Sequence, residues 1–170
     1  MKRLIVAIVV VLAGLVLASP AQAYPTMPQG IQGPYTVLKV VDGDTIYVSA
    51  NGQKLKIRMI GLDTPETVDP RKPVQCFGRE ASAEAKTILG GPSVYLETDP
   101  SQDTVDKYSR TLAYVWTASG RLFNLDMIAD GYAFEYTYDL PYRYQADFKT
   151  AEGGARAQER GLWSPDACQA

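Results

Sequence analysis

Two short stretches of the chain concentrate carboxylates and arginines. The first contains residues 42–45 (DGDT), then Arg58, then residues 63–66 (DTPE). Asp44 opens one apolar run and Asp63 follows the neighbouring run, so pairing of the two runs would bring these carboxylates together. Carboxylate oxygens are the hard ligands that calcium requires. The first stretch therefore predicts a calcium site with an arginine beside it.

Each part of this stretch also has an ordinary structural explanation. The DGDT segment can turn one strand into the next, the DTPE segment can begin a loop, and Arg58 can be a solvated strand residue. For each part alone these explanations are the stronger ones, whereas the combination around one hairpin favours a site. Glu66, at the end of the stretch, could share that site without binding the metal.

The second stretch, residues 106–110 (DKYSR), stands directly before an apolar strand pattern. A cation in that place is commonly just a charge at a strand edge. Here Arg110 stands beside Lys107 and Tyr108, so phosphate contacts and base contacts could come from one segment.

The chain contains no histidine among its 170 residues. This excludes serine–histidine triads, histidine-ligated metal nucleases and ribonucleases that use paired histidines. Catalysis must therefore use carboxylates, arginines, lysines, tyrosines or a metal.

Short strands followed by helices must position these residues. Asn-Gly at positions 51 and 52 separates two alternating apolar runs, a strong hairpin signal because both residues tolerate positive φ. Apolar spacing predicts strands at residues 36–41, 44–50, 53–60, 93–98 and 111–117, and helices at residues 78–89, 122–129 and 141–160. Gly153 and Gly154 weaken the last helix. This order predicts an α+β domain, a five-stranded β-barrel with about three helices, as in OB folds.

The first 23 residues have the pattern of a secretory signal peptide. Two basic residues precede the apolar stretch 4–18, and residues 21–23 (AQA) form a small-x-small cleavage pattern. An uncleaved membrane anchor is the alternative, but this stretch is shorter than the roughly 20 residues that span a bilayer. We expect a signal peptide at 1–23, a flexible leader at 24–33 and one domain at 34–170, either secreted or retained in the periplasm or cell envelope.

Removal of residues 1–23 would leave 15 basic and 19 acidic residues, a net charge of −4. Proteins that bind nucleic acid draw much of their affinity from neutralising phosphates. A nucleic-acid-binding chain with this charge must gather its few cations locally or recruit a metal.

Cys76 and Cys168 are the only cysteines of the chain. Two cysteines are too few for a four-thiolate zinc site, and an exported chain meets oxidising surroundings. We predict a disulfide between them, with two free thiols as the alternative.

Five segments, in order and with similar spacing, resemble the thermonuclease (staphylococcal-nuclease-like) family. They are VDGDTI at 41–46, IRMIGLDTPE at 57–66, FGREAS at 77–82, DKYSRTLAYV at 106–115 and GLW at 161–163. The resemblance implies an OB barrel with three helices. It also implies a calcium-dependent phosphodiesterase that acts on DNA and RNA, cuts the bond to the 5′ oxygen and leaves a 3′-phosphate.

The resemblance implies a role for each residue of the first stretch. Asp44 and Asp63 match the calcium carboxylates, and the backbone carbonyl of Thr64 matches a further ligand of the Ca2+ ion. Arg58 and Arg110 correspond to two arginines that grip the scissile phosphate, where planar guanidinium groups stabilise developing negative charge.

Other matched positions concern the water nucleophile and the substrate. Glu66 corresponds to the carboxylate assigned as general base, which orients or deprotonates the water. Lys107 and Tyr108 match positions that contact substrate phosphate. Either Tyr136 or Tyr138 matches a tyrosine that packs against a nucleotide.

Two features depart from the family pattern. The mature chain is acidic where the best-known relatives are basic, and Glu135 and Asp139 flank the tyrosine-rich segment. Both features put the affinity for long polynucleotides in question. Because the tyrosines are so dense, we expect most of those at positions 132, 136, 138, 142 and 144 to serve packing.

The expected activity is that of a sugar-nonspecific endonuclease, acting as a monomer. One alternative is a noncatalytic OB-type module that binds nucleic acid. Another is a calcium-stabilised envelope domain whose acidic cluster is purely structural. Loss of Arg58, Glu66 or Arg110 would favour the noncatalytic module, and all three are present.

Overall fold

The computed structural model describes residues 23–69, 73–91 and 93–168. Within these residues five strands close into a barrel in the order β1, β2, β3, β6, β5. The strands are β1 (Gln32–Val40), β2 (Thr45–Ala50), β3 (Gln53–Met59), β5 (Val94–Glu97) and β6 (Thr111–Thr117). β3 and β6 pair in parallel, and the other neighbours pair antiparallel. The predicted five-stranded α+β barrel is therefore confirmed.

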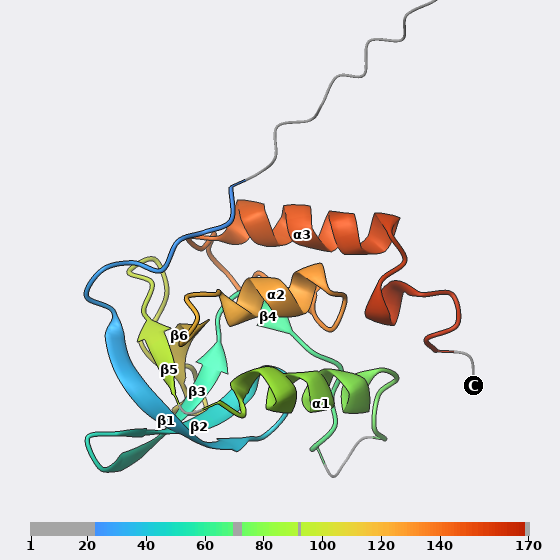
Figure 1. Ribbon diagram of the computed structural model, residues 1–170. Helices are drawn as coiled ribbons and strands as arrows, with labels where there is room; N and C mark the ends of the chain where they lie inside the picture. Colours follow the sequence, from blue (N-terminus) through green and yellow to red (C-terminus); the bar gives the residue numbers. More distant parts are fainter. Residues whose placement is uncertain (1–22, 70–72, 92, 169–170) are drawn as a thin grey trace, which may run out of the picture.

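Three helices accompany the barrel: α1 (Gly78–Leu89), α2 (Phe123–Ala129) and α3 (Gln145–Ala157), followed by the short helix η1 (Gly161–Trp163). In Figure 1, α2 lies between α1 and α3, and it packs on both. The helix α3 is shorter than the predicted 141–160. Tyr142 and Tyr144 are buried core side chains before it begins, and Glu159 takes a positive φ after it ends.

The hairpin of the first acidic stretch forms as predicted. Asn51 (φ 51°) and Gly52 (φ 77°) make the turn between β2 and β3. Ile57 and Met59 are buried in the barrel core. Because side chains alternate along a strand, Arg58 between them points to the opposite face, away from the core.

A second, two-stranded sheet was not predicted. It consists of β4 (Leu62–Asp63) and β7 (Phe134–Glu135), in which Asp63 pairs with Phe134. Beyond it, the backbone N–H of Tyr136 donates to the carbonyl of Gly61 at 3.0 Å. This sheet brings the tyrosine-rich segment beside the DTPE segment.

The segment expected to be a flexible leader has fixed contacts in the structure. The Tyr24 hydroxyl donates to the Asp126 carboxylate at 2.8 Å and accepts from the Leu122 N–H at 2.8 Å. Burial and this carboxylate raise the pKa of Tyr24. The strand β1 begins at Gln32, inside the expected leader. Residues 24–33 are therefore held in part by these hydrogen bonds and by the start of β1, and are not loose throughout.

The expected signal peptide lies outside the described residues except for Ala23 at its end. Across the described ranges, no helix has both the length and the apolar character needed to cross a membrane.

Two buried carboxylates join the barrel to the segment before α3. Glu97 forms an ion pair with Arg143 and accepts from the Trp116 indole N–H at 2.7 Å. Asp99 accepts from the Tyr114 hydroxyl at 2.7 Å and from the backbone N–H of Arg143 at 2.8 Å. Burial raises the pKa of Asp99, but these hydrogen bonds, together with two from Ser101, outweigh burial and lower it. The segment that borders the cleft described below is thereby fixed to the barrel.

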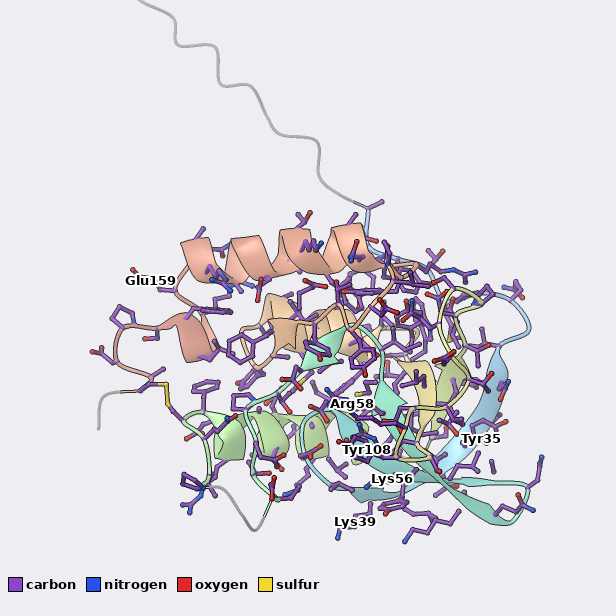
Figure 2. The ribbon with its side chains drawn as sticks, turned by 180° about the vertical axis from the view of Figure 1, so that it is seen from behind. Tyr35, Lys39, Lys56, Arg58, Tyr108 and Glu159 are labelled. Atoms are coloured by element: carbon purple, nitrogen blue, oxygen red, sulfur yellow. A yellow bond between two sulfur atoms is a disulfide. The ribbon has the colours of Figure 1, made fainter. Side chains whose placement is uncertain are left out.

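Cys76 and Cys168 form a disulfide with a Cα–Cα distance of 5.6 Å, as predicted (Figure 2). It joins the segment before α1 to the C-terminal tail. Since Gln75, next to Cys76, also contacts Glu66, the crosslink lies close to the first acidic stretch.

We expect the Cys76→Ser, Cys168→Ser double variant to lose about 2–4 kcal/mol of unfolding free energy, because the crosslink restricts the unfolded chain. The two cysteines are 92 residues apart, so the restricted loop is long. Urea unfolding of the variant and of the oxidised and reduced parent measures the loss. The reduced parent is the control and should match the variant. Equal midpoints and slopes for variant and oxidised parent would contradict the prediction.

Candidate active site

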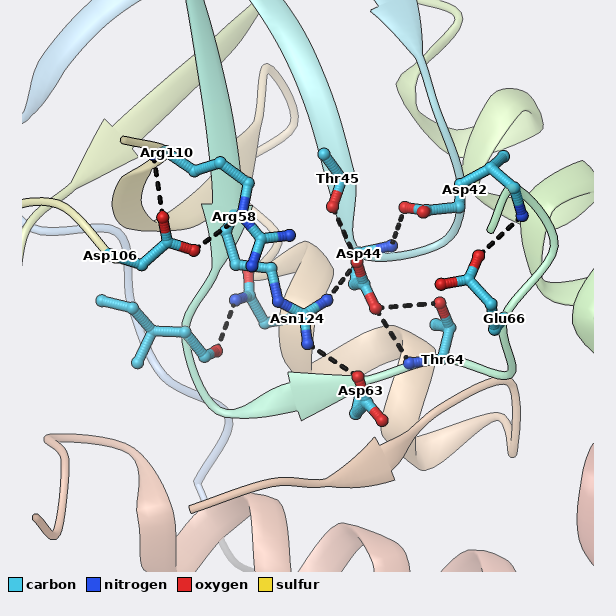
Figure 3. Close-up of polar contacts among 12 residues, drawn as sticks. Asp42, Asp44, Thr45, Arg58, Asp63, Thr64, Glu66, Asp106, Arg110 and Asn124 are labelled. Atoms are coloured by element: carbon cyan, nitrogen blue, oxygen red, sulfur yellow. Dashed lines mark hydrogen bonds and ion pairs between the residues drawn. The ribbon is translucent and has the colours of Figure 1, made fainter. Parts of the chain in front are cut away.

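Arg58 is at the centre of the first acidic stretch. On β3 it pairs with Thr45 of β2 on one side and with Leu112 of β6 on the other. Its Nη1 forms an ion pair with Asp44, and its Nη2 donates to Asp63 at 2.7 Å (Figure 3). Because one planar guanidinium makes both contacts, the carboxylates of Asp44 and Asp63 lie close together around Arg58, as expected from the pairing of β2 with β3.

The two carboxylates differ in their freedom. Asp44 is buried, and it accepts from the Thr45 hydroxyl at 2.8 Å and from both the N–H and the hydroxyl of Thr64 at 3.1 Å. The Asp63 side chain is 49% exposed. Asp44 is therefore fixed before any ligand binds, whereas Asp63 faces solvent.

The oxygen atoms around Asp44 and Asp63 show what kind of Ca2+ site these residues could form. Among the described residues, no three side chains of Asp, Glu, His or Cys are grouped to hold a metal. Asp44, Asp63 and the Thr64 carbonyl would supply few of the six to eight oxygens that calcium takes. Most positions would remain for water and substrate phosphate. The residues therefore fit an open calcium site better than a closed structural one.

Asp42 is a third carboxylate of this region, and the sequence analysis assigned it no role. It is buried, and its Oδ1 accepts the backbone N–H of Asp44 at 3.3 Å. Burial raises the pKa of Asp42, and the charge of Glu66 acts in the same direction, against Arg58. A Cβ on Gly43 would lie 2.5 Å from the Thr64 side chain, so glycine lets this turn pack on the DTPE segment.

Glu66 lies beyond the carboxylate pair, in a loop that it helps to form. Its Oε1 accepts the backbone N–H groups of Val68 at 2.6 Å and Asp69 at 3.1 Å. Gln75 clamps its backbone from the other side, accepting the Glu66 N–H at 2.7 Å and donating its own N–H to the Glu66 carbonyl at 2.9 Å. Glu66 is close enough to Asp42 for its charge to raise the pKa of Asp42. Among the described residues its carboxylate forms no hydrogen bond or ion pair with Arg58.

Arg110 is held by Asp106, which the sequence analysis did not single out. Its Nε donates to Asp106 at 2.6 Å, and Asp106 also accepts the N–H groups of Arg110 and Tyr108, both at 2.9 Å. Burial raises the pKa of Asp106, but these hydrogen bonds outweigh burial and lower it. This anchor is therefore present above the ordinary aspartate pKa of about 3.9 and is lost only as the pH falls through the lower folded-state value.

Both charged stretches meet in one cleft of about 520 Å³. Its lining includes one expected calcium ligand, Asp63, and six expected catalytic and substrate residues: Arg58, Lys107, Tyr108, Arg110, Tyr136 and Tyr138. Lys107 and Arg110 lie over the Tyr108 ring, each 5.3 Å from its centroid. Asp44, Thr64 and Glu66 do not line the cleft.

The tyrosine-rich segment divides between the core and the cleft. Tyr142 and Tyr144 are buried, although Tyr142 also borders the cleft, whereas Tyr136 and Tyr138 are 44% and 72% exposed there. Glu135 accepts from the Tyr142 hydroxyl at 2.8 Å, so this flanking charge is engaged in packing contacts. The two exposed rings remain available for a base.

Asn124 is a positioning residue that local sequence could not reveal. It is fully buried on α2, donates to the Ile60 carbonyl at 2.9 Å and accepts the Val115 N–H at 2.9 Å. The first bond holds the chain between β3 and β4, shortly before Asp63, and the second joins it to β6.

Comparison with known proteins agrees with this geometry. Residues 56–165 match the family model described as "Staphylococcal nuclease homologue". A thermonuclease of Staphylococcus hyicus is 36% identical, over 96% of this chain and 99% of that protein. A thermonuclease of Staphylococcus intermedius is 40% identical over 76% of this chain and 75% of that protein. Endonuclease YncB of Bacillus subtilis is 35% identical over 76% of this chain and 61% of that protein. The chain therefore belongs to the staphylococcal nuclease homologue family.

Proposed function

We propose that this chain is a calcium-dependent, sugar-nonspecific endonuclease that hydrolyses phosphodiester bonds of DNA and RNA. It cuts the bond to the 5′ oxygen and leaves a 3′-phosphate. One observation carries the proposal: Arg58 and Arg110 line one cleft beside Asp63, in a chain of this family.

The two arginines would stabilise the negative charge that hydrolysis adds to the phosphate oxygens. Arg110 is already oriented, since its Nε donates to Asp106. Within the described residues its Nη groups make no hydrogen bond, so they can donate to a phosphate. Arg58 starts from its contacts with Asp44 and Asp63. It can turn towards a phosphate once another cation balances these carboxylates.

Asp44, Asp63 and the Thr64 carbonyl would hold Ca2+ beside the cleft. When bound, the ion would neutralise charge on the phosphate and lower the pKa of a water nucleophile. Glu66 would orient that water and accept its proton. Its two hydrogen bonds to the loop backbone set the direction of the carboxylate beforehand.

Substrate contacts would come from the rest of the cleft. Lys107 and Tyr108 would contact the phosphates next to the scissile one, and Tyr136 or Tyr138 would pack against a base. Exposed rings beside cations are the pattern that single-stranded nucleic acid requires, so single-stranded or locally opened polymers fit best.

We expect cleavage to stop in the presence of a chelator at every pH, and the pH profile between about 5 and 8 to show no imidazole step. The chain has no histidine, and the fitted oxygen donors need a cation. Initial rates with calcium, with chelator and after adding calcium back measure this. Undiminished cleavage under chelation would contradict the metal mechanism.

A DNA-containing gel with the folded protein separates the proposal from its alternatives. Clearing only with calcium supports the nuclease. Retention of labelled DNA without clearing indicates the noncatalytic binding module. The absence of both clearing and retention indicates a calcium-stabilised envelope domain. Cleaved ends that a polymerase extends only after phosphatase treatment would support the 3′-phosphate. The mass of the protein recovered from the producing culture and its cell envelope tests cleavage after Ala23 and export.

A further inference from the structure

The outer face of β2 and β3 continues away from Arg58 as a row of cations around one aromatic ring. Because side chains alternate along a strand, Lys54, Lys56 and Arg58 share one face of β3. Tyr47 of β2 pairs with Lys56, and Lys39 of β1 pairs with Tyr47. Figure 2 shows Arg58, Lys56 and Lys39 following one another along this side of the barrel.

Two ammonium groups of this row share the Tyr47 ring. The Nζ of Lys54 lies 4.0 Å from the ring centroid, and that of Lys56 lies 5.7 Å from it. Among the described residues, none of Lys39, Lys54 and Lys56 forms an ion pair with a carboxylate. Like charges held this close repel one another, so an anionic ligand would lower the electrostatic energy of the face.

The arginines of the molecule differ from these lysines in their pairing. The chain as a whole carries a net charge of −2, and its arginines at positions 58, 110, 121, 143, 156 and 160 each pair with a carboxylate. The lysines around Tyr47 are therefore a local concentration of positive charge without an ion pair in the described part of the chain.

We propose that Lys39, Lys54, Lys56 and Tyr47, here called the lysine track, bind the polynucleotide on one side of the scissile phosphate. The inference rests on the proposed nuclease function. A strand rises about 3.3 Å per residue, so Lys54, Lys56 and Arg58 follow one another at intervals of roughly 7 Å. A single strand held at Arg58 can run along them with its phosphates on the lysines and a base on Tyr47.

Continuity with the cleft favours nucleic acid over an anionic lipid surface. Arg58 belongs both to the row on β3 and to the cleft lining, and Tyr108 lies in the same cleft. A narrow row of lysines beside an aromatic ring matches the linear shape of a polynucleotide, whereas binding to a lipid surface requires no such row. The track also explains how an acidic chain can hold a polyanion, since charge is concentrated where the strand lies.

The test compares two double variants with the same change in charge. Lys54→Gln with Lys56→Gln removes two lysines of the track, and Lys86→Gln with Lys149→Gln removes two exposed lysines on α1 and α3. Fluorescence anisotropy measures binding of a labelled single-stranded oligonucleotide of about 12 nucleotides across a salt series, with chelator present to prevent cleavage.

We expect the track variant to reduce the slope of log K against log salt by about 1.4, because each phosphate contact on a single strand contributes about 0.7. The control variant should keep the parent slope. Tyr47→Leu should weaken binding by about 5- to 100-fold at fixed salt, through loss of base stacking. A track variant whose slope and affinity match the control overturns the proposal.

Cleavage separates a failure of the track from a failure of the nuclease proposal. A dinucleoside monophosphate has no phosphate other than the scissile one, so it can place none on the lysines of the track. The track variant should therefore lose less cleavage efficiency, relative to the parent, on this substrate than on the longer oligonucleotide. If the parent cleaves nothing, the nuclease proposal fails while the binding result still decides the track. Loss of sedimentation with phosphatidylglycerol vesicles, with oligonucleotide binding unchanged, would assign the lysines to a lipid surface and overturn the proposal.

Discussion

Glu66→Gln is expected to slow cleavage by about 10²- to 10⁴-fold, the range for loss of a general base. Glutamine keeps an oxygen that can accept the N–H groups of Val68 and Asp69, so the loop keeps its shape. It cannot accept a proton from water. Because Glu66 is not one of the proposed calcium ligands, the affinity for calcium should stay unchanged. Because the loop bonds are kept, the unfolding free energy should stay unchanged as well.

Single-turnover cleavage of a labelled oligonucleotide at saturating calcium measures the rate of this variant, and calorimetry measures its calcium affinity. Glu80→Gln is the matched control, since Glu80 is exposed on α1 and loses the same charge. The control should cleave at the parent rate. A parent-like rate for Glu66→Gln would remove Glu66 from the proposed mechanism.

Local sequence was sufficient to predict the hairpin formed by β2 and β3. Asn51 and Gly52 accept positive φ whatever surrounds them, and alternation on both sides sets the register that pairs Thr45 with Arg58. The order of five strands and three helices followed from the same local patterns. Elements that depend on distant partners were not predictable: β4 and β7 have two residues each and exist only because they pair across more than 70 positions.

The boundaries of α3 illustrate the same limit. Helical spacing continues through Tyr142 and Tyr144, but both side chains are drawn into the core, where Tyr144 packs edge-on against Tyr114. Tertiary burial therefore delays the start of the helix to Gln145. The two glycines that were expected to weaken it, Gly153 and Gly154, lie within it.

For the candidate site, spacing revealed the residues that would touch ligand but not the residues that hold them. Asp44, Arg58 and Asp63 stand out because charged residues flank one hairpin. Asn124 reaches Ile60 across 64 positions, and no local pattern marks such a contact. Asp106 had a usable signal, because it stands four residues before Arg110 and can pair with it.

Arg58→Gln is expected to slow cleavage by about 10²- to 10³-fold, the usual cost of removing one well-placed donor to the transition state. Unlike loss of a metal ligand, this change should not weaken calcium binding. In the structure the guanidinium contacts both Asp44 and Asp63, so its removal frees oxygens that a cation would otherwise share. We therefore expect calcium affinity equal to or higher than that of the parent.

Arg121→Gln is the control for simple loss of an ion pair. Arg121 pairs with the buried carboxylate of Asp126 and does not line the cleft. It should lower the unfolding free energy without changing the cleavage rate of the folded protein, whereas Arg58→Gln should lower the rate of fully folded protein. Calorimetry with calcium and single-turnover cleavage read the two effects separately. If calcium affinity falls together with the rate in Arg58→Gln, then Arg58 acts by arranging the carboxylates, and its proposed contact with the phosphate is wrong.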